Sequence, residues 1–146
     1  EQIGTVMDIY STIMDASNSS SPAKHPVDGV SLLPQLSGKS NQERPDHFMC
    51  HFPHSHRSSY FTSYRKGDWK LIYRYLTNGG QRKSKDPLPK YELYNLARDP
   101  YEANNLALSH GSKVNEMVHL MSKQLEAENA LLPVRDDLEL RPQLIK

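Results

Sequence analysis

The 146-residue chain lacks the marks of several common protein classes. It contains one cysteine, Cys50, so no disulfide can form within it. No apolar run approaches the roughly 20 residues that a membrane-spanning helix needs, and we expect no membrane partner. The sequence also lacks a glycine-rich phosphate loop, a Gly-x-Ser-x-Gly elbow and a His-Glu-x-x-His helix. These absences argue against a disulfide scaffold, a nucleotide-binding loop, an α/β-hydrolase and a zinc protease.

Length and composition instead describe a loop-rich globular chain. The length fits one domain of ordinary size. Hydrophobic residues make up 36% of the chain, and ten prolines with seven glycines indicate many connections between short elements. The first residue is Glu1 rather than methionine, and we expect the chain to be part of a longer protein.

The net charge of +1 conceals an uneven distribution. Residues 51–90 carry nine Lys or Arg against two acidic residues, whereas the segments on either side are each net negative by three. Such a basic block can attract a sulfated glycan, a nucleic acid or another anion, or it can be a solvated sheet face. Nucleic-acid binding would need the block's aromatic residues for stacking. Because these residues serve equally well as a core, we expect no nucleic-acid partner.

Residues 1–46 are predicted to form a helix followed by an extended connector. Apolar residues recur at helical spacing over residues 3–16, which predicts an amphipathic helix that needs a surface to pack against. This stripe consists of Ile3, Val6, Met7, Tyr10, Ile13 and Met14. The serine-rich stretch before Pro22 ends the helix, and four prolines between Pro22 and Pro45 favour an extended connector.

Residues 47–130 are predicted to form an α+β unit, a four-stranded antiparallel sheet packed against a C-terminal helix. Four segments are rich in aromatic and β-branched residues, as strands are: His47–Phe52, Tyr60–Tyr64, Trp69–Tyr75 and Tyr91–Leu96. Residues 112–129, with Ser112 as cap, carry a helical stripe that should cover one sheet face: Val114, Met117, Val118, Met121 and Leu125. Residues 131–146 contain two prolines and are predicted to be an extended or poorly ordered tail.

Two local patterns predict the environment of single residues. Cys50 lies inside an apolar strand, which favours a buried, inert thiol over a reactive one. Asp99 precedes Pro100 and stands three residues before Glu102, which predicts a short helix with Asp99 as N-cap and Glu102 closing a capping box.

The most conspicuous polar feature is a group of histidines around Pro53. Imidazoles can bind a metal, but His47 and His51 share one strand face, whereas His54 and His56 lie beyond the proline. Substrate contact is a second interpretation, because imidazole and guanidinium groups donate hydrogen bonds to anionic oxygens. It would involve His51, His54 and Arg57. A third interpretation is that the same side chains only make ordinary polar packing contacts.

Two stretches carry distinctive motifs: Gly67–Tyr73 reads GDWKLIY and Tyr91–Ala107 reads YELYNLARDPYEANNLA. They resemble the C-terminal region of type I, formylglycine-dependent, arylsulfatase-like sulfatases, a family that has the same pieces in the same order. Asp8–Thr12 resembles its DIYPT helix, with serine in place of proline, and Asp28–Pro34 resembles its DGVSLLP connector. His51–His54 resembles a HFPH segment of some members, in which this subdomain leans over the mouth of the active site.

The resemblance implies a division into three parts and a parent enzyme of the alkaline-phosphatase-like superfamily. Residues 1–46 would be the helix and connector leading from a catalytic domain, residues 47–130 the sulfatase C-terminal subdomain, and residues 131–146 a tail. The parent would be a sulfuric ester hydrolase that uses calcium and a formylglycine made from a Cys/Ser-x-Pro-x-Arg motif. In the family, these catalytic positions precede the DIYPT helix. We therefore expect no catalytic residue, metal ligand or cofactor within this chain.

Cys50 does not supply the formylglycine motif, because its proline, Pro53, comes one place too late and His54 stands where arginine is required. The resemblance thus implies a C-terminal sulfatase fragment that contributes structure and part of the substrate cleft. Its expected partners are the N-terminal catalytic domain, a sulfated substrate and, by self-association, a second copy of the fragment. The parent is expected to be periplasmic or secreted. A non-catalytic binding module for sulfated glycans or other anions is the alternative.

Overall fold

The computed structural model describes residues 2–54, 60–77 and 87–145. The chain forms two compact units, Glu1–Asp46 and His47–Lys146, and each is described by itself. Arg57 and His56, two of the candidate side chains, lie outside the described residues. None of the helices in the described ranges combines the length and apolar character needed to cross a membrane.

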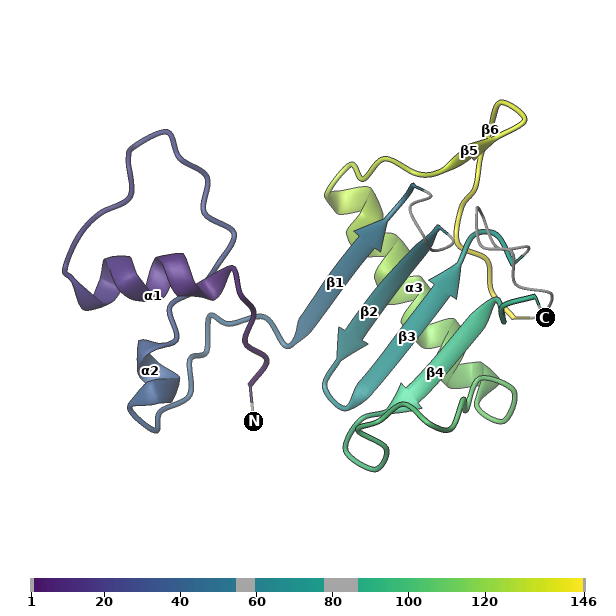
Figure 1. The fold of residues 1–146 in the computed structure, drawn as a ribbon, viewed down its shortest axis with the longest axis horizontal. Coiled ribbons are helices and arrows are strands. Elements are labelled where there is room, and N and C mark those ends of the chain that lie inside the picture. The colour runs from purple at the N-terminus through teal and green to yellow at the C-terminus, as the bar shows by residue number, and fades with distance from the viewer. Residues whose placement is uncertain (1, 55–59, 78–86, 146) are drawn as a thin grey trace. The chain divides into compact units, whose positions relative to one another are not determined.

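The first unit contains two helices, α1 (Asp8–Ala16) and α2 (Leu33–Leu36), joined by a long connector (Figure 1). α1 starts later than the predicted residue 3, and Asp8 marks its first turn. The Asp8 carboxylate accepts a hydrogen bond from the backbone amide of Thr5, just ahead of the helix, at 2.6 Å. The sequence pattern did not predict α2, which is a single turn with Pro34 near its start.

Asp8 and Arg44 form the centre of the first unit. The Asp8 carboxylate accepts hydrogen bonds from the Val30 amide at 2.9 Å and from Arg44 Nη1 at 2.9 Å. The Arg44 guanidinium also donates to the carbonyl oxygens of Ile3, Val30 and Ser31. A buried charge pair is favourable only when such additional hydrogen bonds satisfy it. The pair therefore ties the start of α1, the middle of the connector and its end into one unit.

Gly29 allows the connector to pass against the start of α1. A Cβ atom at this position would lie 2.1 Å from the carbonyl oxygen of Met7, and the nearest obstacles are backbone atoms rather than flexible side chains. Only glycine therefore permits this close approach of two backbone segments. This explains the glycine of the DGVSLLP stretch in physical terms.

The second unit is built on an antiparallel sheet with strands in the order β1 (His47–Phe52), β2 (Phe61–Lys66), β3 (Trp69–Arg74) and β4 (Tyr91–Asn95). Its register pairs Met49 with Tyr64, Tyr64 with Leu71 and Leu71 with Leu93. These side chains lie on one face, since alternate residues of a strand point to the same side. The predicted four-stranded antiparallel sheet is confirmed.

The helix α3 (Gly111–Ala127) covers that face of the sheet (Figure 1). Its buried residues are the five predicted ones, Val114, Met117, Val118, Met121 and Leu125. They form the core together with Tyr64, Leu71, Tyr73 and Leu93. The α+β fold class predicted from the sequence is therefore confirmed. The helix begins one residue before Ser112, with His110 in the cap position and no side-chain cap bond.

The tail differs from the predicted extended segment. Two short strands, β5 (Val134–Arg135) and β6 (Leu138–Glu139), form a hairpin, and the chain then returns along the unit. Tyr91 donates its hydroxyl hydrogen to the carbonyl oxygen of Gln143, and the Asn115 side chain exchanges two hydrogen bonds with the backbone of Ile145. These hydrogen bonds tie the end of the tail to β4 and α3.

Two local predictions were wrong. Cys50 is exposed, because β1 is an edge strand and alternation turns Cys50 away from the face that α3 covers. The segment after Asp99 is a turn rather than a helix, because Glu102 has a φ of +55°. Asp99 accepts hydrogen bonds from the amides of Ala103 and Asn104 instead, while Glu102 pairs with Lys70.

Candidate functional site

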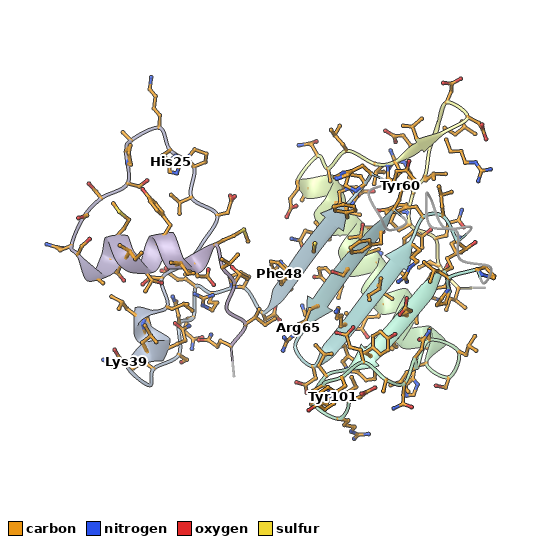
Figure 2. The ribbon with its side chains drawn as sticks, viewed as in Figure 1. His25, Lys39, Phe48, Tyr60, Arg65 and Tyr101 are labelled. Carbon is orange, nitrogen blue, oxygen red and sulfur yellow. The ribbon has the colours of Figure 1, made fainter. Side chains whose placement is uncertain are left out.

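The candidate site lies at the end of the sheet where β1 finishes and β2 begins, near Tyr60 (Figure 2). The antiparallel register places His51 directly opposite Thr62. His51 Nδ1 lies 2.7 Å from Thr62 Oγ1, which in turn lies 2.9 Å from the hydroxyl oxygen of Tyr75. On its other side, His51 Nε2 lies 2.8 Å from the carbonyl oxygen of Leu131. The sheet and the start of the tail thus hold His51 between them.

The partners of His51 determine where its proton lies. The Leu131 carbonyl can only accept, so His51 Nε2 must donate to it. Burial raises the pKa of the Tyr75 phenol, which therefore keeps its proton at neutral pH. An arrangement in which Tyr75 donates to Thr62, Thr62 donates to His51 Nδ1 and His51 Nε2 donates to Leu131 satisfies each of these groups.

This chain of hydrogen bonds limits what His51 can do. Thr62 is completely buried, so its hydroxyl depends on His51 and Tyr75 for partners. Both ring nitrogens of His51 are bonded within the chain. Contact between His51 and a substrate would require one of these bonds to break. Sequence reasoning missed Thr62 because only the strand register brings it to His51.

His54 has different surroundings from those of His51. It is exposed, and its ring centroid lies 4.1 Å from that of Phe52. Phe52 stacks in turn on Phe61, its cross-strand partner, at 5.6 Å. Because alternation turns Phe52 away from the face of His51, the structure does not bring His51 and His54 together. His54 is left as the accessible described member of the predicted substrate-contact set.

The histidines do not form a metal site in the described part of the chain. No group of three or more His, Cys, Asp or Glu side chains there is arranged to hold an ion. His47, the first histidine of the group, stacks on Tyr64. A calcium site requires several oxygen ligands, and the Asp8 carboxylate is already bonded to Thr5, Val30 and Arg44. The described residues therefore do not fit the calcium expected in the parent enzyme.

The basic block is partly neutralised by acidic residues that follow it in the sequence. Lys70 Nζ lies 2.6 Å from Glu102 Oε1, and Arg74 forms an ion pair with Glu92. Lys90 Nζ lies 5.8 Å from the ring centres of both Tyr73 and Tyr91. Four further basic residues of the block lie outside the described ranges: Arg57, Arg82, Lys83 and Lys85. The paired charges weaken the case for an anion-binding module on the sheet.

The described residues of the second unit line at least two surface pockets. A pocket of about 450 Å³ next to Leu131 is lined by Glu126, Glu139 and Arg141 among others, and its charged groups make it unfavourable for a sulfate. The second, of about 460 Å³, has the indole of Trp69 in its wall, with Arg98 and His110 beside it. Lys113 covers the Trp69 ring at 5.6 Å.

Comparison with known families and structures agrees with the fold and the sequence motifs. A family model described as N-sulphoglucosamine sulphohydrolase, C-terminal, matches residues 1–130. Comparison with curated proteins found no match. Two structures of similar fold are BT4656, solved in complex with its substrate D-glucosamine-2-N,6-O-disulfate, and BT1596, a 2-O GAG sulfatase. Their TM-scores are 0.59 and 0.62, with 23% and 20% sequence identity.

A third similar structure is the phosphonate monoester hydrolase of Agrobacterium radiobacter, with 21% identity and a TM-score of 0.58. The matches to BT4656, BT1596 and this hydrolase cover 84%, 84% and 88% of the present chain, but 24%, 25% and 26% of those chains. The present chain thus spans about a quarter of the length of these structures. From the match over residues 1–130 and the shared fold, we conclude that the chain belongs to the N-sulphoglucosamine sulphohydrolase C-terminal family of sulfatases.

Proposed function

We propose that this chain is the C-terminal segment of a formylglycine-dependent sulfatase, that it forms one wall of the substrate cleft, and that it does not catalyse hydrolysis itself. One observation carries the proposal: nearly the whole chain matches a sulfatase C-terminal family, yet it corresponds to only a quarter of the similar solved structures. The remaining part of the parent protein would supply the catalytic centre, and the parent would be periplasmic or secreted.

The residues of this chain support the non-catalytic part of the proposal. Neither Cys50 nor any serine begins a Cys/Ser-x-Pro-x-Arg sequence. The nearest match, Ser20 to Lys24, has lysine in place of the arginine. When present, the hydrated formylglycine supplies the nucleophile that attacks sulfur. This chain's own contribution would be to shape the cleft and to bind polar groups of the substrate.

His54 and Arg57 are the side chains we assign to substrate contact. The ring of His54 is exposed and packs on Phe52, so its imidazole can donate to an anionic oxygen without breaking the bonds that hold His51. Arg57 follows three residues later, and its guanidinium would match a sulfate or carboxylate in a bidentate way. A sulfated glycan offers both kinds of group.

A chemical test of the proposal does not depend on guessing the substrate. The protein encoded by the complete reading frame is digested and its peptides are examined by mass spectrometry for a formylglycine within a Cys/Ser-x-Pro-x-Arg sequence. Bound calcium is measured in parallel for this protein and for the 146-residue chain. Formylglycine and calcium in the longer protein, and neither in the shorter chain, would support the proposal. A longer protein with neither would overturn it.

A further inference from the structure

The pocket beside Trp69 lies at the end of the sheet remote from His51. Trp69 is the first residue of β3, and its cross-strand neighbour Asn95 is the last residue of β4 (Figure 1). The row of the sheet that contains His51 and Thr62 crosses β3 at Tyr73 instead. From Trp69 to Tyr73 the distance along the strand is about 13 Å. The pocket is therefore separate from the candidate site around His51.

The pocket combines an apolar wall with polar groups that can bond to a ligand. Its volume is about 460 Å³, within the range of about 300–1,000 Å³ that small-molecule sites occupy. The Trp69 indole and the Leu106 side chain supply apolar surface. Asn95 uses its side-chain oxygen to accept from the Arg98 backbone amide, and no described contact uses its side-chain NH₂ group. An indole beside amide and guanidinium donors suits a sugar, which has an apolar C–H face and a rim of hydroxyl groups.

Arg98 is the cation that this pocket offers to an external anion. Its side chain is exposed and forms no hydrogen bond or ion pair within the described ranges of the chain. Lys113, the other cation nearby, pairs with Glu116 at 2.9 Å. The Asp99 carboxylate is held by two backbone amides of its own turn. An anionic group on a ligand would therefore complete the bonding of Arg98 without displacing an existing partner.

We propose that this pocket is a second, non-catalytic binding site for a sugar unit that carries an anionic group, either a sulfate or a carboxylate. The pyranose ring packs its C–H face on the Trp69 indole, and its hydroxyl groups bond to the Asn95 amide. The anionic group accepts two parallel hydrogen bonds from the Arg98 guanidinium. The inference goes beyond the proposed function and does not depend on whether the parent protein hydrolyses sulfate esters.

The composition of the pocket favours an anionic sugar over a free anion. An exposed ion pair with Arg98 alone is worth little, and Lys113 is already paired. Contact with the Trp69 indole adds apolar burial that an inorganic sulfate ion cannot use. An uncharged sugar gains the indole contact but leaves Arg98 without an anionic partner. Only a ligand with both features uses the whole pocket.

The single tryptophan of the sequence reports on the site. Because Trp69 is the only tryptophan, proton–nitrogen correlation NMR of the isotope-labelled 146-residue chain gives one indole N–H signal. Four compounds are titrated at constant ionic strength: methyl galactoside sulfated at its primary hydroxyl, methyl galacturonide, uncharged methyl galactoside and sodium sulfate. The sulfated sugar, the galacturonide or both should shift the signal saturably. Half-saturation should need a concentration roughly tenfold lower than for the uncharged sugar or the sulfate ion.

Two arginine variants distinguish the pocket from general charge attraction. Arg98→Ala and the control Arg135→Ala each remove one exposed arginine, and Arg135 lies in the hairpin of the tail. Arg98→Ala should weaken binding of the anionic sugar about tenfold and leave the uncharged sugar unaffected. Arg135→Ala should bind like the wild-type chain. Both variants should unfold at the wild-type temperature, because exposed side chains contribute little to stability.

Four results would overturn the proposal. One is the absence of a saturable shift with both anionic sugars. A second is equal binding of sodium sulfate, which would show an adventitious ion only. A third is equal binding of the uncharged sugar, which would show that the anionic group is not recognised. The last is binding that Arg98→Ala leaves unchanged, or that Arg135→Ala weakens equally, because the ligand would then bind elsewhere.

Discussion

The guanidinium of Arg44 lies 2.9 Å from the carboxylate of Asp8, and the two side chains are 3% and 5% exposed, respectively. The pair joins segments that are 36 residues apart in the sequence. Removing one partner of such a buried pair leaves an uncompensated buried charge. The DIYPT-like helix and the DGVSLLP-like connector are therefore held by the same interaction.

Asp8→Asn should destabilise the first unit strongly. Breaking a buried ion pair from one side costs about 3–5 kcal/mol, and a neutral amide side chain cannot accept from Thr5, Val30 and Arg44 as the charged carboxylate does. Asp15→Asn is the matched control, because the Asp15 side chain is exposed and bonds only to Ser31 among the described contacts; it should cost less than about 1 kcal/mol. Hydrogen exchange of the amides of residues 8–16 measures the loss of stability in each of the two variants. Equal protection in the two variants would contradict the role of Asp8.

The same carboxylate predicts how stability depends on pH. Burial by itself would raise the pKa of Asp8, but hydrogen bonds from the Thr5 and Val30 amides and the Arg44 guanidinium outweigh it and hold this pKa below its ordinary value of 3.8. A group with a lowered folded-state pKa stabilises above its unfolded pKa and loses that contribution as pH falls through the folded pKa. Hydrogen-exchange protection of residues 8–16 should therefore stay constant as the pH falls to 3.8, and it should decrease at lower pH.

Asp8→Asn is also the control for the pH experiment, because it removes the titrating carboxyl. Its protection should be lower at neutral pH and should change less on acidification than that of the wild-type chain. An identical acid-dependent loss in both proteins would assign the effect to carboxyl groups other than that of Asp8.

Gly29→Ala should destabilise the contact between the connector and α1. The added methyl group would meet the Met7 backbone at a distance that no real contact allows, and such overpacking costs about 1–3 kcal/mol. Gly4→Ala provides the control, because its nearest neighbour would be the Leu32 side chain at 3.4 Å. Chemical denaturation of both variants, followed by circular dichroism, measures the difference. A Gly29→Ala protein as stable as Gly4→Ala would show that the close approach is absent in solution.

His51 and His54 should respond differently to substitution. His51→Ala leaves buried Thr62 without one of its partners and should cost about 1–3 kcal/mol, whereas His54→Ala on the surface should stay within about 0.5 kcal/mol of wild type. If the proposed function holds, His54→Ala in the complete protein should raise KM for a sulfated glycan and leave kcat nearly unchanged, since uniform binding is lost. An unchanged KM would show that His54 does not contact the substrate.

Sequence patterns predicted the second unit well because its core follows simple periodicities. The alternation from Trp69 to Tyr73 defines one apolar face of a strand, and the stripe from Val114 to Leu125 defines one apolar face of a helix. Once the strands pair into a sheet, these two faces can only be buried against each other. Cys50 was misjudged because alternation places it on the sheet face that α3 does not cover. Which face of a sheet a helix covers depends on packing between elements far apart in the sequence, and alternation within one strand does not contain that information.

The contacts of the candidate site depend on residues far apart in the sequence, which local patterns do not reveal. His51 bonds to Leu131, 80 residues away, and to Thr62, whose position opposite His51 follows only from the register. Four residues of the predicted apolar stripe, Val6, Met7, Tyr10 and Ile13, are exposed, whereas Ile3 and Met14 are half-buried. Periodicity shows that a helix has an apolar face, but it does not show that the partner of that face lies in the same segment.

The most direct test of the central claim is sulfate release from a chromogenic aryl sulfate, with and without added calcium. The 146-residue chain and the protein translated from the complete reading frame are compared at equal molar concentration. We predict calcium-dependent sulfate release by the complete protein and none by the 146-residue chain. Sulfate release by the 146-residue chain alone would contradict the claim that it is a non-catalytic sulfatase segment.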